Sequence, residues 1–311
     1  MMIKNKIVLG TWAWGDNNSY FGNSYDENHF RLVYEAAISK NLTFFDTATA
    51  YGSGRSEEIL GNLIANTPRS ELTISTKFTP QMAPKTDNPV QTMLDESLKR
   101  LKTDYIDYYW IHNDADVEKW THDLLPVLKE GKIKHVGVSN HTLSEIKRVQ
   151  EILAEEGFKL ATVQNHLSLL DRSSETAGIL DYCKENNLEF FAYMVLEQGA
   201  LTGKYNVNNP FPAGSVRAQV YNDKLPELTD LVTKLEEIGK NYDLSAAQTA
   251  MAWALSKDTF PIIGVTKVNQ VEDAAQVAAT RLTKSEIQEL EDVAEKINVN
   301  TTGSWEPDMD K

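Results

Sequence analysis

Residues 41–61, NLTFFDTATAYGSGRSEEILG, form the stretch from which both the fold and the chemistry can be inferred. The apolar run 42–45 is short and aromatic, which predicts a buried strand. Asp46 follows this strand directly, and Tyr51 lies five residues further on. In parallel α/β folds, chemistry takes place at the carboxyl ends of the strands. The stretch therefore predicts an acid and a phenol side by side at such an edge.

The second half of the stretch predicts a turn and a helix. Gly52 to Gly54 provide the turn, and an apolar-periodic segment follows from Ser56. We expect Ser56 to cap this helix, because serine is a preferred N-cap residue. Glu57 and Glu58 would then lie in the first turn, where the helix dipole favours carboxylates.

Short apolar runs and amphipathic segments alternate along the rest of the chain. The expected strands are residues 7–10, 42–45, 72–77, 105–111, 135–139, 160–165, 190–195 and 261–264. The expected helices are residues 27–40, 56–65, 90–101, 120–130, 143–156, 176–186, 225–242, 245–255 and 270–279, with further helix near the end. An insertion, residues 203–224, separates two of these units.

Eight strand–helix units predict an α/β fold in which a parallel (β/α)8 TIM barrel is covered by helices, because parallel strands need crossover connections. A doubly wound open sheet is the alternative. Its dinucleotide fingerprint, G-x-G-x-x-G, is absent after the first strand, where the sequence is GTWAWG (10–15). Since no linker or change in composition divides the chain, we expect residues 1–311 to form one domain.

Composition narrows the possible partners. The 31 Lys and Arg against 45 Asp and Glu give a net charge of -14, which disfavours binding to nucleic acid or to anionic membranes. Cys183 is the sole cysteine, so an internal disulfide is impossible and a reducing compartment is expected; we interpret it as a core residue. With no signal-like or membrane-spanning segment in the sequence, we expect a cytoplasmic protein, either a monomer or a homo-oligomer.

Four chemically complementary side chains follow adjacent expected strands: Asp46, Tyr51, Lys77 and His112. Because adjacent parallel strands end at the same mouth, these side chains should lie close together. A tyrosine alone titrates near ~10, but a buried ammonium beside it favours the phenolate, and Asp46 can hold Lys77 in place. His112 can polarise a carbonyl oxygen. The set suits carbonyl reduction, for which a nicotinamide must supply the hydride.

The tetrad sits among motifs that extend along nearly the whole chain. They are DTATAYG (46–52), SEEILG (56–61), Lys77, IH (111–112), GKIKHVGVSN (131–140), VQNHLSLLDR (163–172), LEQGALTGKY (196–205) and GVTKVNQVEDA (264–274). Together they closely resemble the aldo-keto reductase family. The resemblance implies a barrel enzyme that reduces aldehydes and ketones with NADPH, with Asp46, Tyr51, Lys77 and His112 as its catalytic tetrad and Tyr51 as the general acid.

The resemblance also implies which residues hold NADPH/NADP+. Ser139, Asn140 and Gln164 would bind the nicotinamide carboxamide, and Tyr193 would stack on its ring. The loop around the pyrophosphate corresponds to Leu196, Gln198, Gly199, Leu201 and Gly203, and the adenosine phosphate would be bound by Gly264, Thr266, Lys267 and Gln270. Many relatives have Arg where this chain has Gln270, Asn where it has Ala274 and Pro where it has Val195.

Several alternatives remain open at this level. The substrate cannot be named, although Trp12, Trp14, Phe21 and Trp305 are candidates for a hydrophobic mouth. A nucleotide-binding regulatory subunit, similar to the potassium-channel beta subunits, is the second functional class. A barrel lyase or isomerase without a nicotinamide is the third. We expect no metal, because the acids and histidine of residues 112–116 are spaced like a solvated loop and the family uses none.

Overall fold

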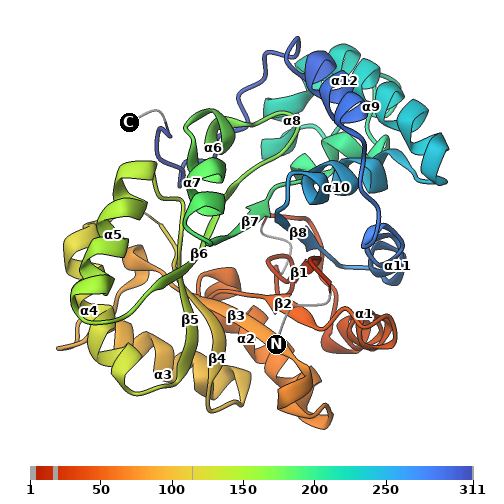
Figure 1. Ribbon diagram of the computed structural model, residues 1–311. Helices are drawn as coiled ribbons and strands as arrows, with labels where there is room; N and C mark the ends of the chain where they lie inside the picture. Colours follow the sequence, from red (N-terminus) through yellow and green to blue (C-terminus); the bar gives the residue numbers. More distant parts are fainter. Residues whose placement is uncertain (1–4, 17–19, 114, 310–311) are drawn as a thin grey trace.

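A computed structural model describes residues 5–16, 20–113 and 115–309 (Figure 1). Eight parallel strands close into a barrel in sequence order, each paired with its neighbours along the chain, and β1 pairs with β8. The strands are β1 (Val8–Gly10), β2 (Phe44–Asp46), β3 (Thr73–Phe78), β4 (Ile106–Ile111), β5 (Ile133–Ser139), β6 (Leu160–His166), β7 (Glu189–Tyr193) and β8 (Phe260–Gly264). The predicted barrel is confirmed.

Helices surround this barrel, as the ring of helices around the strands in Figure 1 shows. They are α1 (Glu27–Ser39), α2 (Arg55–Leu63), α3 (Pro89–Leu101), α4 (Val117–Lys129), α5 (Leu143–Glu155), α6 (Ser173–Thr176), α7 (Ile179–Glu185), α8 (Val216–Tyr221), α9 (Leu225–Gly239), α10 (Ala246–Ser256), α11 (Val268–Val277) and α12 (Lys284–Ala294). Within the described ranges, none of them combines the length and the apolarity that a bilayer crossing demands.

The inside of the barrel is filled with aromatic rings. Tyr108, Trp110 and Phe191 pack together with ring centroids 5.0 to 6.2 Å apart, and Phe260 stacks on Phe191 at 4.8 Å. Val8 and Phe44 complete this inner cluster. Because these side chains close the interior, only the strand ends are free to build a site.

Helix and strand ends differ from the sequence prediction where one residue changes the backbone. The predicted helix 176–186 is two helices, because Gly178 adopts φ 77° between α6 and α7. Helix α4 begins at Val117 rather than Trp120, since the Asp116 carboxylate accepts the Lys119 amide at 3.1 Å and caps it. Strand β7 ends two residues early because Met194 has φ 60°.

The prediction that Ser56 caps α2 is wrong. The N-cap is Gly54, whose φ of 91° is left-handed, and no side chain caps the helix. Ser56 is fully buried instead. Its hydroxyl donates to the Thr11 carbonyl at 2.8 Å and accepts from the Thr47 hydroxyl at 3.0 Å. The serine therefore ties together the loops that follow β1 and β2.

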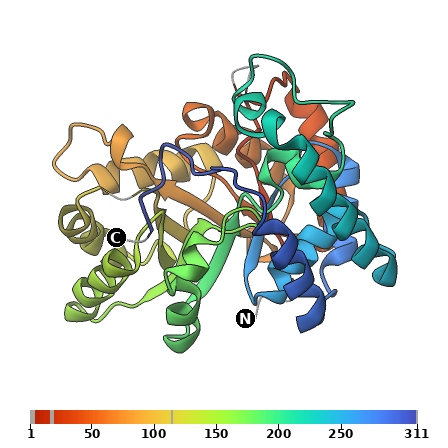
Figure 2. The ribbon, with the colours of Figure 1, turned by 90° about the horizontal axis from the view of Figure 1, so that it is seen from above.

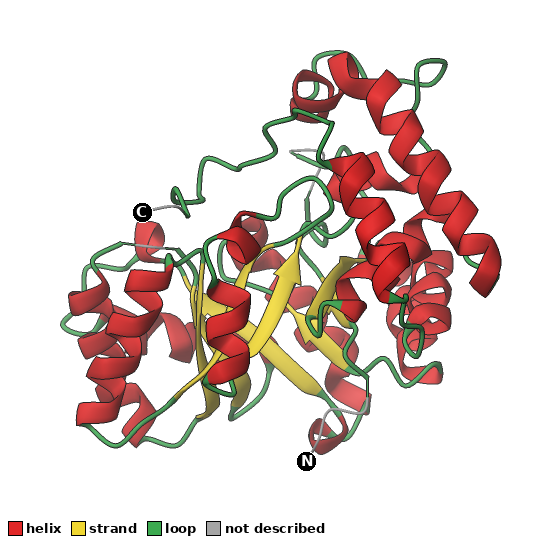
Figure 3. Cartoon of the chain, turned by 45° about the horizontal axis from the view of Figure 1, so that its top comes forward, coloured by secondary structure: helices red, strands yellow, loops and turns green. Residues whose placement is uncertain are grey.

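Two segments outside the regular units lie over the carboxyl ends of the strands. The insertion 203–224 contains the short helix α8. After α12 the chain runs without regular structure across the end of the barrel, as the dark-blue trace in Figure 2 and the upper loop in Figure 3 show. We refer to residues 295–309 as the C-terminal tail. Buried Cys183, on α7, is a core residue as predicted, and burial raises the pKa of its thiol to about 12.

Candidate functional site

Lys77 is the centre of the predicted tetrad. Its side chain is completely buried. The ammonium donates to Asp46 Oδ2 at 2.6 Å, to the Thr47 carbonyl at 2.8 Å and to the Tyr51 hydroxyl at 3.2 Å. All three of its protons are therefore engaged, and one of them points at the phenol oxygen.

The barrel register explains how this arrangement forms. Asp46 on β2 pairs with Ser75 on β3, and Lys77 lies two residues further along the same face of β3. The Ser75 hydroxyl donates to Asp46 Oδ1 at 2.6 Å, and the Gln164 amide donates to the same oxygen at 3.3 Å. Asp46 is thus oriented by three donors from two other strands.

Tyr51 reaches the ammonium from the turn that follows β2. Gly52 and Ser53 both adopt left-handed conformations, with φ 57° and 53°. Burial raises the pKa of the Tyr51 hydroxyl above its ordinary value, and the charge of Lys77 opposes this increase. From the sequence only the opposing effect of the ammonium was predicted, and burial outweighs it. The net direction keeps the phenol protonated at neutral pH, which is the form that a proton donor requires.

His112 follows β4, where its amide donates to the Phe78 carbonyl at 2.8 Å. Its Nδ1 lies 3.0 Å from the Thr79 hydroxyl, and its ring centroid lies 5.9 Å from that of Tyr51. Burial, and after it the charge of Lys77, lowers the pKa of His112 well below its ordinary value. The imidazole is therefore neutral and can donate one hydrogen bond.

Ser139 is the last residue of β5 and pairs with Gln164 on β6, and Asn140 follows the strand. The Asn140 amide is already engaged: its Nδ2 donates to the His112 carbonyl at 2.9 Å and to Asn113 Oδ1 at 3.0 Å, while its Oδ1 accepts from the Tyr193 hydroxyl. Asn140 and Tyr193 therefore lie at the mouth and are hydrogen-bonded to each other.

The loop after β7 has an unusual backbone. Glu197, Gln198 and Gly199 have φ values of 46°, 53° and 105°. The amides of Gly199 and Leu201 both donate to the Leu196 carbonyl, at 2.9 and 3.3 Å. Leu201 itself is completely buried in the core.

The loop after β8 is open to solvent. A Cβ on Gly264 would meet no atom within 4 Å. The amides of Thr266 and Lys267 donate to Gln270 Oε1 at 2.7 and 3.0 Å. Gln270 therefore holds the N-terminus of α11, and the exposed Lys267 supplies the positive charge of this loop.

Arg217, on α8 in the insertion, has no assigned role in the sequence argument. Its guanidinium lies 3.5 Å from the Gln198 carbonyl and packs near the rings of Tyr205 and Phe211. No motif surrounds this arginine in the sequence, so only the fold brings it to the loop after β7.

These two loops have the features of a phosphate-binding rim. Open space lies over the Gly264 backbone, and Lys267 and Arg217 bring positive charge to the loops that follow β8 and β7. Barrels often bind phosphate beside their last two strands. The donor set and the open backbone fit the phosphate groups of a dinucleotide.

Aromatic rings line the mouth beside Tyr51. Trp12 stacks on Tyr51 with centroids 5.9 Å apart and contacts Tyr20, Phe21 and Trp305 at 5.0 to 5.8 Å. Trp14 is not part of this wall. It is fully buried, and its indole N–H donates to the Val265 carbonyl at 2.7 Å.

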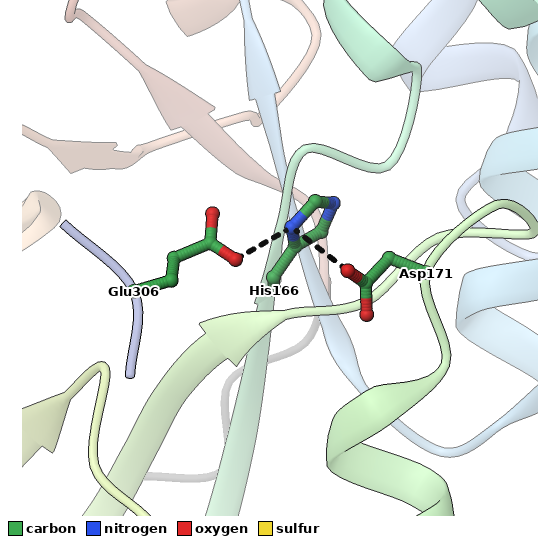
Figure 4. Close-up of side chains that lie close together, drawn as sticks. All are labelled: His166, Asp171 and Glu306. Carbon is green, nitrogen blue, oxygen red and sulfur yellow. Dashed lines mark hydrogen bonds and ion pairs between the residues drawn. The ribbon is translucent and has the colours of Figure 1, made fainter. Parts of the chain in front are cut away.

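A second charged cluster lies near the mouth, where Figure 4 shows His166, Asp171 and Glu306 facing one another. Their nearest ligand-type atoms lie within 4.8 Å, and the structure, as far as it describes the chain, contains no other such group of three. His166 ends β6, Asp171 follows in the next loop, and Glu306 comes from the C-terminal tail. Neither the predicted tetrad nor the predicted cofactor residues include any of the three.

The chain is similar to known proteins over most of its length. The model of the aldo/keto reductase family matches residues 6–295. The aldo-keto reductase yakc of Schizosaccharomyces pombe, whose name specifies NADP(+), is 30% identical over 93% of this chain and 90% of its own. The chloroplastic pyridoxal reductase of Arabidopsis thaliana is 29% identical over 93% of this chain and 82% of its own.

The fold recurs among solved structures. The glycerol dehydrogenase of Gluconobacter oxydans superposes with a TM-score of 0.83 at 26% sequence identity, covering 96% of this chain and 94% of that chain. The similarity therefore extends over nearly the whole chain.

Proposed function

The chain belongs to the aldo/keto reductase family, and on that basis we propose that it reduces an aldehyde or ketone with NADPH, Tyr51 being the proton donor. The observation that carries this proposal is the triple coordination of the Lys77 ammonium by Asp46, the Thr47 carbonyl and the Tyr51 hydroxyl. In such an arrangement the phenol can donate its own proton, and the adjacent ammonium stabilises the phenolate that this leaves.

The protein's part in the reaction follows from these contacts. The Tyr51 hydroxyl donates its proton to the substrate oxygen, and Lys77, held by Asp46, stabilises the phenolate that is left. The neutral His112 donates a second hydrogen bond to the same oxygen as negative charge develops on it. When bound, the nicotinamide supplies the hydride to the carbonyl carbon.

The proposed cofactor contacts divide into three groups. Ser139, Asn140 and Gln164 would hold the carboxamide, and Tyr193 would face the nicotinamide ring. The loop of residues 196–203, with Arg217 beside it, would hold the pyrophosphate. Gly264, Thr266 and Lys267 would hold the adenosine phosphate, with Gln270 fixing the helix that presents them.

The Asn140 contacts add a condition to this assignment. Both of its N–H groups are used by His112 and Asn113, so only its carbonyl oxygen, already bonded to Tyr193, has capacity left. In this proposal Ser139 and Gln164 make the main carboxamide contacts, while Asn140 and Tyr193 orient each other.

Replacing Tyr51 by Phe tests the proton donor. We expect turnover with an aldehyde panel to fall by about 10²–10⁴, because general-acid assistance has that value. NADPH affinity should remain unchanged, because the proposed cofactor contacts do not include the lost hydroxyl. Loss of NADPH absorbance measures the rate, and cofactor fluorescence measures the affinity.

Tyr182→Phe is the matched control, since that hydroxyl bonds Gln150 on the outer helices. Near-wild-type turnover by Tyr51→Phe would remove the tyrosine from the mechanism. Tight NADPH binding by the wild type without turnover of any carbonyl would instead favour the regulatory-subunit class.

Lys267→Ala tests the choice of nicotinamide. A charge-assisted hydrogen bond contributes roughly 1.5–3 kcal/mol, so we expect NADPH to bind about tenfold or more weakly. NADH affinity should remain nearly constant, because NADH lacks the 2′-phosphate. Fluorescence titration of wild type and variant with NADPH and NADH measures both affinities. An equal decrease in affinity for the two cofactors would show that Lys267 does not contact the 2′-phosphate.

A further inference from the structure

The C-terminal tail contributes a ring to the mouth of the barrel. Trp305 contacts Trp12 edge-on at 5.8 Å, and Trp12 stacks on Tyr51 at 5.9 Å. A tight turn shapes the tail here: the Glu306 amide donates to the Gly303 carbonyl at 3.0 Å, and a Cβ on Gly303 would lie 2.5 Å from the Trp305 ring. The position of Trp305 therefore depends on how the tail is held.

His166 holds the next residue of the tail. Its Nδ1 lies 3.1 Å from Glu306 Oε2 (Figure 4), and its Nε2 lies 2.9 Å from Glu197 Oε1. The side chains of His166 and Glu197 are completely buried, and that of Glu306 is 3% exposed. One imidazole thus connects the tail to a carboxylate in the loop after β7.

Carboxylates face this ring on both of its nitrogens. Glu197 also accepts from the Tyr221 hydroxyl at 2.8 Å and from the Ser168 hydroxyl, while Asp171 Oδ2 lies 3.7 Å from Nδ1. Tyr193 stacks on the ring at 5.4 Å. Burial lowers the pKa of His166, but Glu197 and Glu306 together raise it well above its ordinary value. The ring is therefore an imidazolium at neutral pH.

Loss of one proton would affect the two sides of the ring unequally. A neutral imidazole keeps a single N–H. The proton that stays is the one on Nε2, because Glu197 lies closer to the ring than Glu306, at 2.9 against 3.1 Å, and is the larger of the two causes that raise the pKa of His166. Nδ1 would then present a lone pair to Glu306, which turns an attraction into a repulsion. Deprotonation thus releases the tail while leaving the loop after β7 bound.

We propose that His166 is a positioning residue whose imidazolium form latches Glu306, so that Trp305 stays in the aromatic wall of the substrate mouth. The part of this inference that concerns substrate affinity rests on the proposed reductase function. The contact between His166 and Glu306 is independent of that function, because it concerns only how the tail is held. The sign follows from the raised pKa of His166: the latch holds below its titration and weakens as the pH rises through it.

A divalent cation is the competing occupant. The nearest ligand atoms of His166, Asp171 and Glu306 lie within 4.8 Å of one another, and Glu306 Oε1 has no hydrogen-bond partner among the described residues. The 3.1 Å separation of Nδ1 from Glu306 Oε2 is a hydrogen-bond distance, which favours a proton between them. Experiments with and without a chelator separate the two occupants.

Glu306→Gln tests the latch on a residue outside the barrel, so the fold itself is not at risk. Thr302→Ala, an exposed change in the same tail, is the matched control. We expect the KM for a bulky aromatic aldehyde to rise about tenfold in Glu306→Gln, with kcat and NADPH affinity unchanged, because a charge-assisted hydrogen bond is lost.

Hydrogen exchange of the tail amides provides a measurement that needs no turnover. Wild type and the control Thr302→Ala should both lose tail protection as the pH rises, whereas Glu306→Gln should lack that protection at every pH. His166→Gln should behave like Glu306→Gln. The same variants should show a pH-independent KM where the wild-type KM rises with pH.

Two outcomes would overturn the proposal. One is equal tail protection and equal KM in wild type and Glu306→Gln at all pH values. The other is a tail that opens when chelator is added, or that closes with one equivalent of zinc, which would make the cluster a cation site. If the protein reduces no carbonyl at all, hydrogen exchange still tests whether His166 holds the tail. Failure of the latch proposal can therefore be distinguished from failure of the proposed function.

Discussion

Neighbouring residues of β3 lead to two different buried ion pairs. Lys77 points to the inside of the barrel and binds Asp46 at 2.6 Å. Thr76 points to the outside, where its hydroxyl donates at 2.5 Å to Glu57, which binds Arg100 at 2.6 Å. Asp46 and Glu57 are both almost completely buried. Burial and pairing alone therefore do not distinguish a catalytic pair from a structural one.

The surroundings of the two pairs make the difference. The outer pair is enclosed between α2 and α3, where the helices pack so closely that a Cβ on Gly61 would lie 2.1 Å from the Arg100 carbonyl oxygen. Its remaining partners are the internal hydroxyls of Thr49 and Ser97 and the exposed carboxylate of Glu96, which lies 3.6 Å from the Arg100 guanidinium. The inner pair instead contacts Tyr51, a titratable group at the open mouth. A buried pair becomes a candidate for chemistry when it controls a proton that a substrate can reach.

Lys77→Met should have the largest effect, because it removes the cation from the inner pair. We expect the rate of carbonyl reduction to fall by about 10²–10⁴. Asp46 would also be left without its cation, which should lower the free energy of unfolding by about 3–5 kcal/mol. Lys77 lowers the pKa of Tyr51, so the alkaline decline in residual activity should move to higher pH. Steady-state rates and urea denaturation measure these effects.

Arg100→Met should affect stability and leave the chemistry intact. Glu57 would lose its cation in a fully buried position, and we expect the free energy of unfolding to fall by about 3–5 kcal/mol. Below the unfolding temperature, kcat should stay close to the wild-type value. A decrease in kcat as large as that of Lys77→Met would show that the two pairs are coupled and that the comparison is wrong.

Ser75→Ala and Thr76→Val give a smaller and more local test. Each change removes one hydroxyl that donates to a buried carboxylate, Asp46 in one case and Glu57 in the other. Hydrogen bonds to charged groups contribute roughly 1.5–3 kcal/mol, so both variants should unfold more easily by about that amount. Only Ser75→Ala should also slow carbonyl reduction, because Asp46 orients Lys77. Equal kinetics in the two variants would contradict this assignment.

The barrel and the assembled tetrad were predictable because each depends on a local pattern. Eight strand–helix units imply a parallel barrel, and residues that follow adjacent strands must meet at one mouth. Asp46, Lys77 and His112 therefore come together by topology alone. Tyr51 joins them because the turn at Gly52 is short.

Other features depend on contacts between distant segments, which no local pattern records. Ser56 resembles a cap in sequence, yet it is buried against Thr11. The positive pKa shift of Tyr51 arises from burial, which the residue's neighbours in sequence do not reveal. Arg217 and Glu306 come from an insertion and from the C-terminal tail, so their contacts with the loop after β7 and with His166 are visible only once the chain is folded.

The central claim is that the inner pair, through Tyr51, provides the chemistry and the outer pair provides stability. Its most direct test is one assay of NADPH consumption with an aldehyde, run on wild type, Tyr51→Phe and Arg100→Met at a temperature where all three are folded. We predict turnover lowered by about 10²-fold or more in Tyr51→Phe and near the wild-type rate in Arg100→Met. Turnover retained by Tyr51→Phe, or lost equally in both variants, would contradict the account.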